Sequence, residues 1–283
     1  MKIYPLNTGN FKLDGGAMFG VVPKTLWSRT NKPDENNMCS WSMRSMLIED
    51  GERLMLIDTG IGDKQSEKFF SHYYLFGDDS LQGNLKKLGF SPDDITDVFL
   101  THLHFDHCGG AVERIGENNY QPVFKNATFW STEKHWKWAT EPNEREKASF
   151  LSENILPIEE SGQLKFVTRK EDYSKDVFKD IDLLFVDGHT ESQMIPHIRY
   201  KGKTLVFMAD LLPSVGHIPL PFVMGYDTRP LLTLNEKDKF LKKAAQEEYI
   251  LFLEHDYENE CCTLKETEKG IRLDQTFKFD ELF

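Results

Sequence analysis

Short apolar runs of strand length alternate with helical or turn patterns along most of the chain. Residues 45–50 and 53–60 are two such runs, and they flank Asp50-Gly51, a dipeptide typical of a β-hairpin turn. Further strand-like runs occur at residues 97–102, 127–131, 182–189, 197–210 and 248–256. Within residues 197–210 a hairpin is expected to turn at Lys201-Gly202-Lys203.

Helical patterns separate these strands. Amphipathic spacing predicts a helix over residues 79–90, closed by Gly89, and another over residues 236–248. Residues 108–115 are expected to begin a third helix. The alternation of strands and helices predicts an α/β fold in which helices cover the sheets.

Residues 131–180 differ from the rest because they are rich in charge and interrupt the strand pattern. We expect this insert to be helical at first and then loop or short strand, covering one side of a larger domain. It contains too few apolar residues for a core of its own, whereas the whole chain is 39% apolar over 283 residues. The prediction is a single domain over residues 1–283.

Composition excludes several classes of protein. Basic residues number 34 and acidic residues 46, so the net charge is −12, which argues against a nucleic-acid partner. No apolar run approaches the roughly 18–20 residues of a membrane span, so no membrane association is expected. The first residues, MKIYPLNTGNFKLDGG, lack the apolar block of a secretory signal. With four cysteines and no C-x-x-C pair, reduced thiols and a cytoplasmic protein are expected.

The segment most informative about chemistry follows the apolar run at residues 97–102. His102, His104, Asp106 and His107 place four metal-capable side chains within six residues, in the pattern H-x-H-x-D-H. In an extended segment the two-residue spacing directs His102, His104 and Asp106 to one side, and His107 breaks this alternation where the chain turns. Imidazole and carboxylate are ligands for zinc, so the segment predicts a metal site.

Three more strand-like runs end in a possible ligand, namely His189, Asp210 and His255. The carboxyl ends of strands are where α/β proteins gather functional side chains. With the H-x-H-x-D-H segment they make seven ligands, which suits two metals if one carboxylate bridges them. Seven ligands for two metals leave open coordination positions, and open positions favour catalysis over a structural role.

The H-x-H-x-D-H segment, followed in order by His189, Asp210 and His255, resembles the metallo-β-lactamase fold superfamily. Leu56-Ile57-Asp58-Thr59-Gly60 is similar to the first motif of that family, whose Asp supports the metal loop. The resemblance implies an αββα sandwich of two mixed β-sheets flanked by helices. It also implies one metal on His102, His104 and His189, a second on Asp106, His107 and His255, and Asp210 as the bridge.

Imidazole at position 104 favours two zinc ions over the di-iron centre of the H-x-E-x-D-H branch, with iron, manganese and cobalt as alternatives. A histidine at position 107 is similar to the motif of the dinuclear hydrolase branches of the superfamily. The sequence HLHFDHCGG resembles the corresponding motif of N-acyl-homoserine lactonases and methyl-parathion-hydrolase-like enzymes. Similar lactonases carry a Tyr three residues after the bridging Asp, where this chain has Pro213. Tyr226 lies further on, but its spacing does not match.

The hypothesis is therefore a dinuclear zinc hydrolase in which a bridging hydroxide attacks a lactone or ester carbonyl, as in a quorum-quenching lactonase. Asp210 and Asp106 are the candidate catalytic residues, Asp106 as a general acid. Hydrolysis of phosphotriesters or aryl esters on the same metals is the alternative, ahead of a thioesterase, a nuclease or a non-enzymatic sensor. Similar lactonases are often homodimers.

Apolar segments suggest a small-molecule substrate with an acyl or aryl part. Residues 15–20 and 218–224 could line a pocket or belong to the core, and Phe105 sits inside the metal loop. The other histidines are expected to be ordinary structural or surface residues: His72, His135, His197 and His217. For His217, which follows Asp210 closely, contact with a substrate is the alternative.

Overall fold

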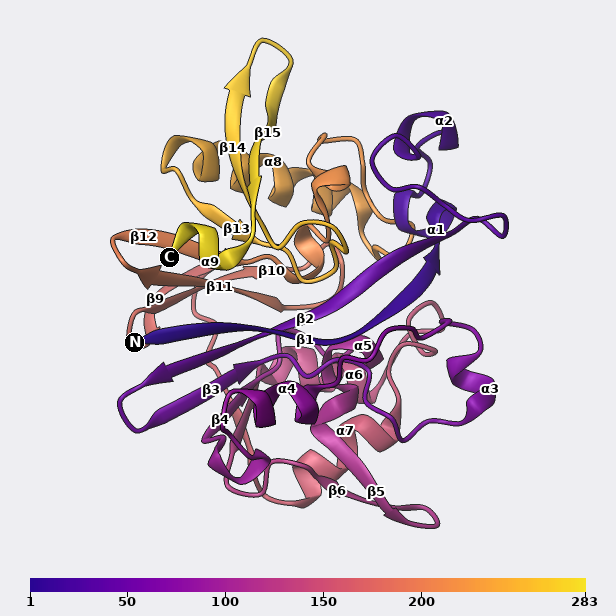
Figure 1. Ribbon diagram of the computed structural model, residues 1–283, viewed down its shortest axis with the longest axis vertical. Coiled ribbons are helices and arrows are strands. Elements are labelled where there is room, and N and C mark those ends of the chain that lie inside the picture. Colours follow the sequence, from indigo (N-terminus) through magenta and orange to yellow (C-terminus); the bar gives the residue numbers. More distant parts are fainter. The chain divides into compact units, whose positions relative to one another are not determined.

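The computed structural model describes residues 1–283, which form two compact units. Unit 1 consists of Met1–Phe11 and Ser42–Arg169, and unit 2 of Lys12–Trp41 and Lys170–Phe283. Strands β1 (Lys2–Asp14) and β2 (Met38–Asp50) each contribute residues to both. Figure 1 labels the elements along the chain. The assignment of residues 1–283 to a single domain stays a prediction.

Unit 1 is built on a six-stranded mixed sheet in the order β1-β2-β3-β4-β7-β8. Its remaining strands are β3 (Arg53–Ile57), β4 (Asp97–Phe99), β7 (Thr128–Ser131) and β8 (Leu164–Phe166). β2 and β3 form the predicted hairpin, pairing Asp50 with Arg53, and β3, β4, β7 and β8 run parallel. Parallel strands place their carboxyl ends at one edge, which is where the H-x-H-x-D-H segment begins.

The helices of unit 1 are short. They are α3 (Glu67–Phe70), α4 (Leu81–Lys87), α5 (Phe105–Cys108), α6 (Glu133–Thr140) and α7 (Ser152–Glu160), with a 3₁₀ turn at Pro92–Asp94. α4 confirms the amphipathic pattern, because it buries Leu81 and Leu85 in the core of the unit and ends before Gly89, whose φ is +86°. Val98 and Phe129 from the central strands belong to the same core.

The prediction of a helix over residues 108–115 is wrong. A 3₁₀ turn at Gly109–Ala111 leads into β5 (Val112–Gly116), which pairs with β6 (Asn119–Pro122) as a separate hairpin. This hairpin projects from the rest of unit 1 (Figure 1). The two glycines at the start pack against a neighbouring loop, and β-branched Val112 and Ile115 suit a strand better than a helix.

The charge-rich residues 131–180 follow the predicted order of elements. The helices α6 and α7 come first, and the short strands β8 and β9 (Tyr173–Phe178) follow. The boundary between the two units falls inside this stretch, at Arg169 and Lys170.

Unit 2 is built on a seven-stranded sheet in the order β15-β14-β13-β12-β11-β10-β9. Its further strands are β10 (Ile181–Val186), β11 (Gln193–Tyr200), β12 (Lys203–Phe207), β13 (Ile250–Phe252), β14 (Cys261–Thr267) and β15 (Gly270–Phe277). Only β12 and β13 pair in parallel. The predicted hairpin is confirmed between β11 and β12, where Lys201 and Gly202 have φ of +48° and +79°.

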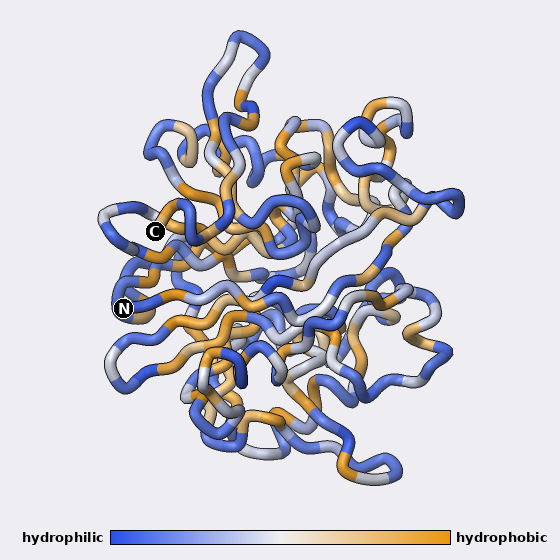
Figure 2. The backbone as a smooth tube through the Cα atoms, in the orientation of Figure 1, coloured by the Kyte–Doolittle hydropathy of each residue, from blue (hydrophilic) through white to orange (hydrophobic).

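The helices of unit 2 are α1 (Gly15–Phe19), α2 (Lys24–Trp27), α8 (Pro230–Gln246) and α9 (Phe279–Leu282), with 3₁₀ turns at Ala209–Leu211 and Val215–His217. α8 begins six residues before its predicted start, because Pro230 occupies the first turn and Thr233 is buried. Hydrophobic segments concentrate along the strands, whereas the tip of the β14–β15 hairpin is hydrophilic (Figure 2).

Two features bear on the predicted setting of the protein. All four cysteines are buried and unbridged, as expected. The helices are either too short or too polar to cross a bilayer, including the 17-residue α8.

Candidate metal centre

His102, His104, Asp106 and His107 form what we call the unit 1 ligand group. An extended segment after β4 carries the first two residues, and the short helix α5 carries the last two. The Nε2 atom of His102 lies 3.1 Å from Nδ1 of His104, and the His102 and His107 rings are 3.9 Å apart between centroids. Nε2 of His107 lies 3.8 Å from Oδ2 of Asp106. All four side chains are buried.

Asp58 organises this group without joining it. Its carboxylate accepts hydrogen bonds from the Thr101 backbone N–H at 2.8 Å and the Thr101 hydroxyl at 2.6 Å, and it lies 3.0 Å from Nδ1 of His107. Such a contact fixes the imidazole with Nδ1 as the donor and makes Nε2 the nitrogen that can accept a metal. Asp58 therefore has the supporting role that the sequence motif implies.

The loop after Asp58 also holds the backbone of the ligand group. Thr59 N–H donates to the His107 carbonyl at 2.7 Å, and the buried Lys64 ammonium donates to the Gly109 carbonyl. Burial lowers the pKa of Lys64 to about 8. A Cβ atom on Gly109 would lie 2.1 Å from the carbonyl oxygen of Ile61, so only glycine fits this close approach.

Two buried residues of the charge-rich stretch support the group, and sequence reasoning missed both. His135, dismissed as an ordinary histidine, accepts a hydrogen bond from the Leu103 N–H through Nε2 at 2.9 Å. Oε1 of Glu146 lies 3.3 Å from Nε2 of His104, and its other oxygen accepts from the Trp138 indole at 2.7 Å. Neither stands in a recognisable motif; the one available signal is that both lie in a polar stretch near three tryptophans.

His189, Asp210 and His255 form the unit 2 ligand group. They follow β10, β12 and β13 respectively, at the strand ends where the sequence placed them. Asp210 lies between two imidazoles: Oδ2 is 3.0 Å from Nε2 of His189, and Oδ1 is 3.0 Å from Nε2 of His255. Ala209 has a φ of +40°, rare for alanine, and this backbone conformation directs the following Asp210.

A second carboxylate contacts His189 at its other ring nitrogen. Oδ1 of Asp227 lies 2.9 Å from Nδ1 of His189, which leaves Nε2 for Asp210 or a metal. Burial lowers the pKa of His189, but the Asp210 and Asp227 carboxylates outweigh burial and raise it to about 10. The surroundings of this imidazole therefore favour a positive charge.

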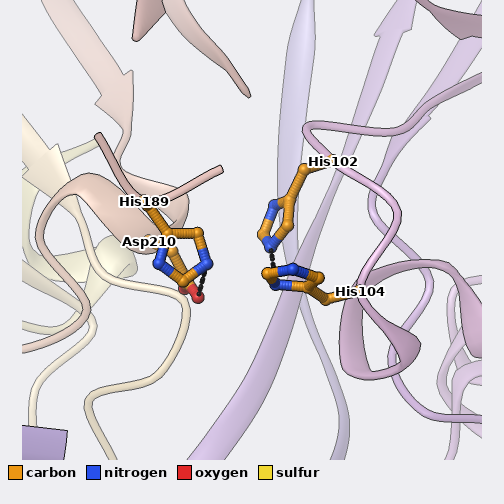
Figure 3. A group of neighbouring side chains, drawn as sticks. All are labelled: His102, His104, His189 and Asp210. Atoms are coloured by element: carbon orange, nitrogen blue, oxygen red, sulfur yellow. Dashed lines mark hydrogen bonds and ion pairs between the residues drawn. The ribbon is translucent and has the colours of Figure 1, made fainter. Parts of the chain in front are cut away.

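The donor chemistry of each group fits a divalent metal. Imidazole nitrogens and carboxylate oxygens are borderline and hard ligands suited to zinc, iron, manganese or cobalt. In His107 and His189 the second ring nitrogen contacts a carboxylate, an arrangement typical of metal-binding histidines. Figure 3 shows His102 with His104 from the unit 1 group, and His189 with Asp210 from the unit 2 group. The sharing of metal ions among all seven residues stays a prediction.

The remaining histidines have other surroundings. His72 is exposed, and His197 is buried among Tyr173, Phe240 and Tyr249. Burial lowers the pKa of His197 to about 4. His217 stacks on Phe19 in the interior, so these histidines are structural or surface residues as expected.

The apolar segments offered as pocket walls are divided between the interior and a small cavity, which Phe222, Val223 and Met224 line together with Asp210. Met18, Phe19, Ile218 and Met224 are buried. A different apolar surface surrounds Phe105: Phe69 meets it edge-on at 5.3 Å and Tyr73 lies 4.7 Å away between ring centroids.

A model of the metallo-beta-lactamase superfamily matches residues 44–255 of the sequence. The chain belongs to this superfamily, and it is a metal-dependent hydrolase with candidate metal-binding His and Asp groups. The predicted α/β fold class is confirmed, since the two mixed sheets and their helices match solved structures of this fold.

Several known proteins are similar to this chain. An N-acyl homoserine lactonase of Bacillus thuringiensis is 26% identical over 76% of this chain and 81% of its own length. The crystal structure of a "probable metal-dependent hydrolase" from Staphylococcus aureus has a TM-score of 0.87 and 29% identity, covering 98% of this chain and 96% of its own. AidC, a dizinc quorum-quenching lactonase, has a TM-score of 0.78 and 22% identity, covering 98% of this chain and 95% of its own. At this identity the similarity concerns the fold only.

Proposed function

We propose that this chain is a dinuclear zinc hydrolase that opens the lactone ring of N-acyl-homoserine lactones. The proposal rests on the geometry of Asp210. One oxygen of its carboxylate lies 3.0 Å from Nε2 of His189, and the other lies 3.0 Å from Nε2 of His255. This disposition suits a carboxylate that binds one metal through each of its two oxygens. Lactonases among the relatives of the chain support the choice of substrate.

In this proposal both ligand groups contribute side chains to each of the two metal sites. One ion would be held by His102, His104 and His189, the other by Asp106, His107 and His255, and Asp210 would contact both. When bound, two such ions lower the pKa of a water molecule and polarise the carbonyl oxygen of a substrate.

The residues of the chain then have distinct tasks. Asp58 and Asp227 orient His107 and His189, which fixes the nitrogen that each presents. Asp106, the carboxylate of the unit 1 ligand group on α5, would also carry a proton to the leaving alkoxide.

The aromatic cluster of Phe69, Tyr73 and Phe105 supports a substrate with an apolar acyl or aryl part. Phe69 and Tyr73 are partly exposed, and their ring centroids lie 5.0 Å apart. Burial and the Asp106 carboxylate raise the pKa of Tyr73 to about 12, so its hydroxyl keeps its proton and can donate a hydrogen bond. We assign to Tyr73 the contact with the substrate carbonyl for which this chain has no tyrosine at Pro213.

The test is turnover by the zinc-loaded enzyme on acyl-homoserine lactones, aryl esters, paraoxon and bis(nitrophenyl) phosphate. The proposal predicts that the lactones are the preferred substrates and that Asp210→Asn abolishes turnover. Asp274→Asn, which alters a surface ion pair with Lys265, is the matched control and keeps full activity. Paraoxon hydrolysis with inert lactones would refute the lactonase assignment and favour the phosphotriester alternative.

Two finer expectations accompany this function. Buried, reduced cysteines support a cytoplasmic setting, in which the enzyme would act as a quorum quencher on lactones that enter the cell. The second expectation is a homodimer, which is tested by light scattering of the purified enzyme, and a monomer would refute it.

A further inference from the structure

Helix α8 carries a buried lysine whose charge has no carboxylate in hydrogen-bond contact. Lys237 is 1% exposed, and its ammonium group donates to three backbone carbonyls of one segment. These are the carbonyls of His217 at 2.9 Å, Pro219 at 3.2 Å and Phe222 at 2.8 Å. An ammonium has three N–H donors, so all three are used on the segment that follows Asp210.

Glu236, the preceding residue of α8, contacts a different loop, and it accepts hydrogen bonds where Lys237 donates them. The carboxylate of Glu236 accepts hydrogen bonds from the backbone N–H groups of Asp187 at 2.8 Å and Gly188 at 3.0 Å. These residues immediately precede His189. Gly188 also lies directly against Thr233 of α8, where a Cβ atom would come within 2.4 Å of the threonine hydroxyl.

Of the two loops held by α8, one carries His189 and the other carries both carboxylates that contact it. The segment that starts at Asp210 returns to His189 at Asp227, so one end contacts Nε2 of that imidazole and the other end contacts Nδ1. Asp210, Asp227 and Lys237 line a cavity of about 10 Å³ together with residues of this segment, so the segment packs closely around the lysine. The path of the segment therefore depends on the three carbonyl contacts.

We propose that Glu236 and Lys237 are positioning residues that set the geometry of the unit 2 ligand group. The carboxylate fixes the loop of His189 through its amide hydrogens, and the ammonium fixes the segment from Asp210 to Asp227 through its carbonyls. This inference rests on the proposed function, because it takes His189 and Asp210 as metal ligands. It predicts that α8 governs metal affinity without touching a metal.

The first measurement is hydrogen exchange on the full chain in EDTA, which requires neither metal nor substrate. Lys237→Met removes the ammonium while retaining an apolar side chain of similar length, and it should raise exchange selectively in residues 211–227. Glu236→Gln leaves one acceptor for two N–H groups and should raise exchange at residues 187–189. Lys239→Met, at an exposed position of the same helix, is the control and should match the parent.

The second measurement is zinc affinity by competition with a chromophoric chelator. Loss of groups that orient metal ligands typically weakens binding by about 10–100-fold, and for Lys237→Met and Glu236→Gln we expect about tenfold weaker zinc binding. Parent-like zinc affinity in both variants, or exchange raised uniformly through unit 2, would overturn the proposal, the latter by indicating a general loss of stability. If the parent binds zinc tightly but does not open lactones, the proposed substrate is refuted. The positioning role of Glu236 and Lys237 is then decided by the zinc affinities of the two variants.

Discussion

His217 gives the clearest quantitative prediction about stability. Its Nε2–H donates to the Met18 carbonyl at 2.9 Å, and its Nδ1 accepts from the Ser214 hydroxyl at 2.8 Å. The ring stacks on Phe19 with centroids 4.3 Å apart and is 1% exposed. Both nitrogens are thus satisfied in the neutral form, and burial lowers the pKa of His217 to about 3.

The sign of the pH dependence follows from this depressed pKa. In the unfolded chain the imidazole titrates at its ordinary value of 6.5, so between pH 6.5 and about 3 the unfolded state binds the extra proton. Stability is therefore lost as the pH falls. Over the roughly 1.5 pH units from 6.5 to about pH 5, at about 1.36 kcal/mol per unit, His217 removes about 2 kcal/mol.

The assay is urea unfolding of the protein in EDTA, followed by tryptophan fluorescence, at about pH 7.5 and about pH 5. His217→Gln keeps a donor for the Met18 carbonyl but cannot titrate. Its loss of stability between the two pH values should be smaller than that of the parent by about 2 kcal/mol. His72→Gln, at an exposed position, should retain the parent's pH difference. Identical pH differences in the parent and His217→Gln would refute the reasoning.

Three further predictions concern the site and the core. Asp227→Asn weakens the hold on Nδ1 of His189 and should lower zinc affinity about 10–100-fold in a chelator competition; unchanged affinity would contradict the role of Asp227. Tyr73→Phe should lower kcat/KM for lactones at least tenfold with the zinc content unchanged, and unaltered kinetics would exclude Tyr73 from substrate binding. Leu85→Ala, at a fully buried core position, should cost about 2–5 kcal/mol in urea unfolding with the active-site metal still bound, and a loss near zero would contradict the packing of α4.

Turn dipeptides and hydrophobic periodicity correctly predicted several strands, turns and helices. The Asp50-Gly51 turn, the apolar strand before His102 and the amphipathic pattern of α8 all appear in the structure. Periodicity and turn chemistry are properties of neighbouring residues, so one sequence suffices to recognise them. The three strand ends that carry His189, Asp210 and His255 were found in the same way.

The features that sequence reasoning missed depend on contacts between distant residues. Gly109 and Gly110 are followed by a strand because they pack against the backbone of residues 59–61, and no local pattern reveals that contact. His135 and Glu146 reach the unit 1 ligand group from more than 30 residues away along the chain. Lys237 resembles a solvated lysine of an amphipathic helix until its three carbonyl partners are known.

Seven imidazole and carboxylate side chains are proposed to share two metal ions, with Asp210 as the bridge. Anomalous diffraction at the zinc edge from crystals of the zinc-loaded protein tests this arrangement most directly. The expected result is two peaks about 3.5–4 Å apart, with one oxygen of Asp210 on each. A single peak, or two peaks with His189 or His255 directed away from them, would contradict it.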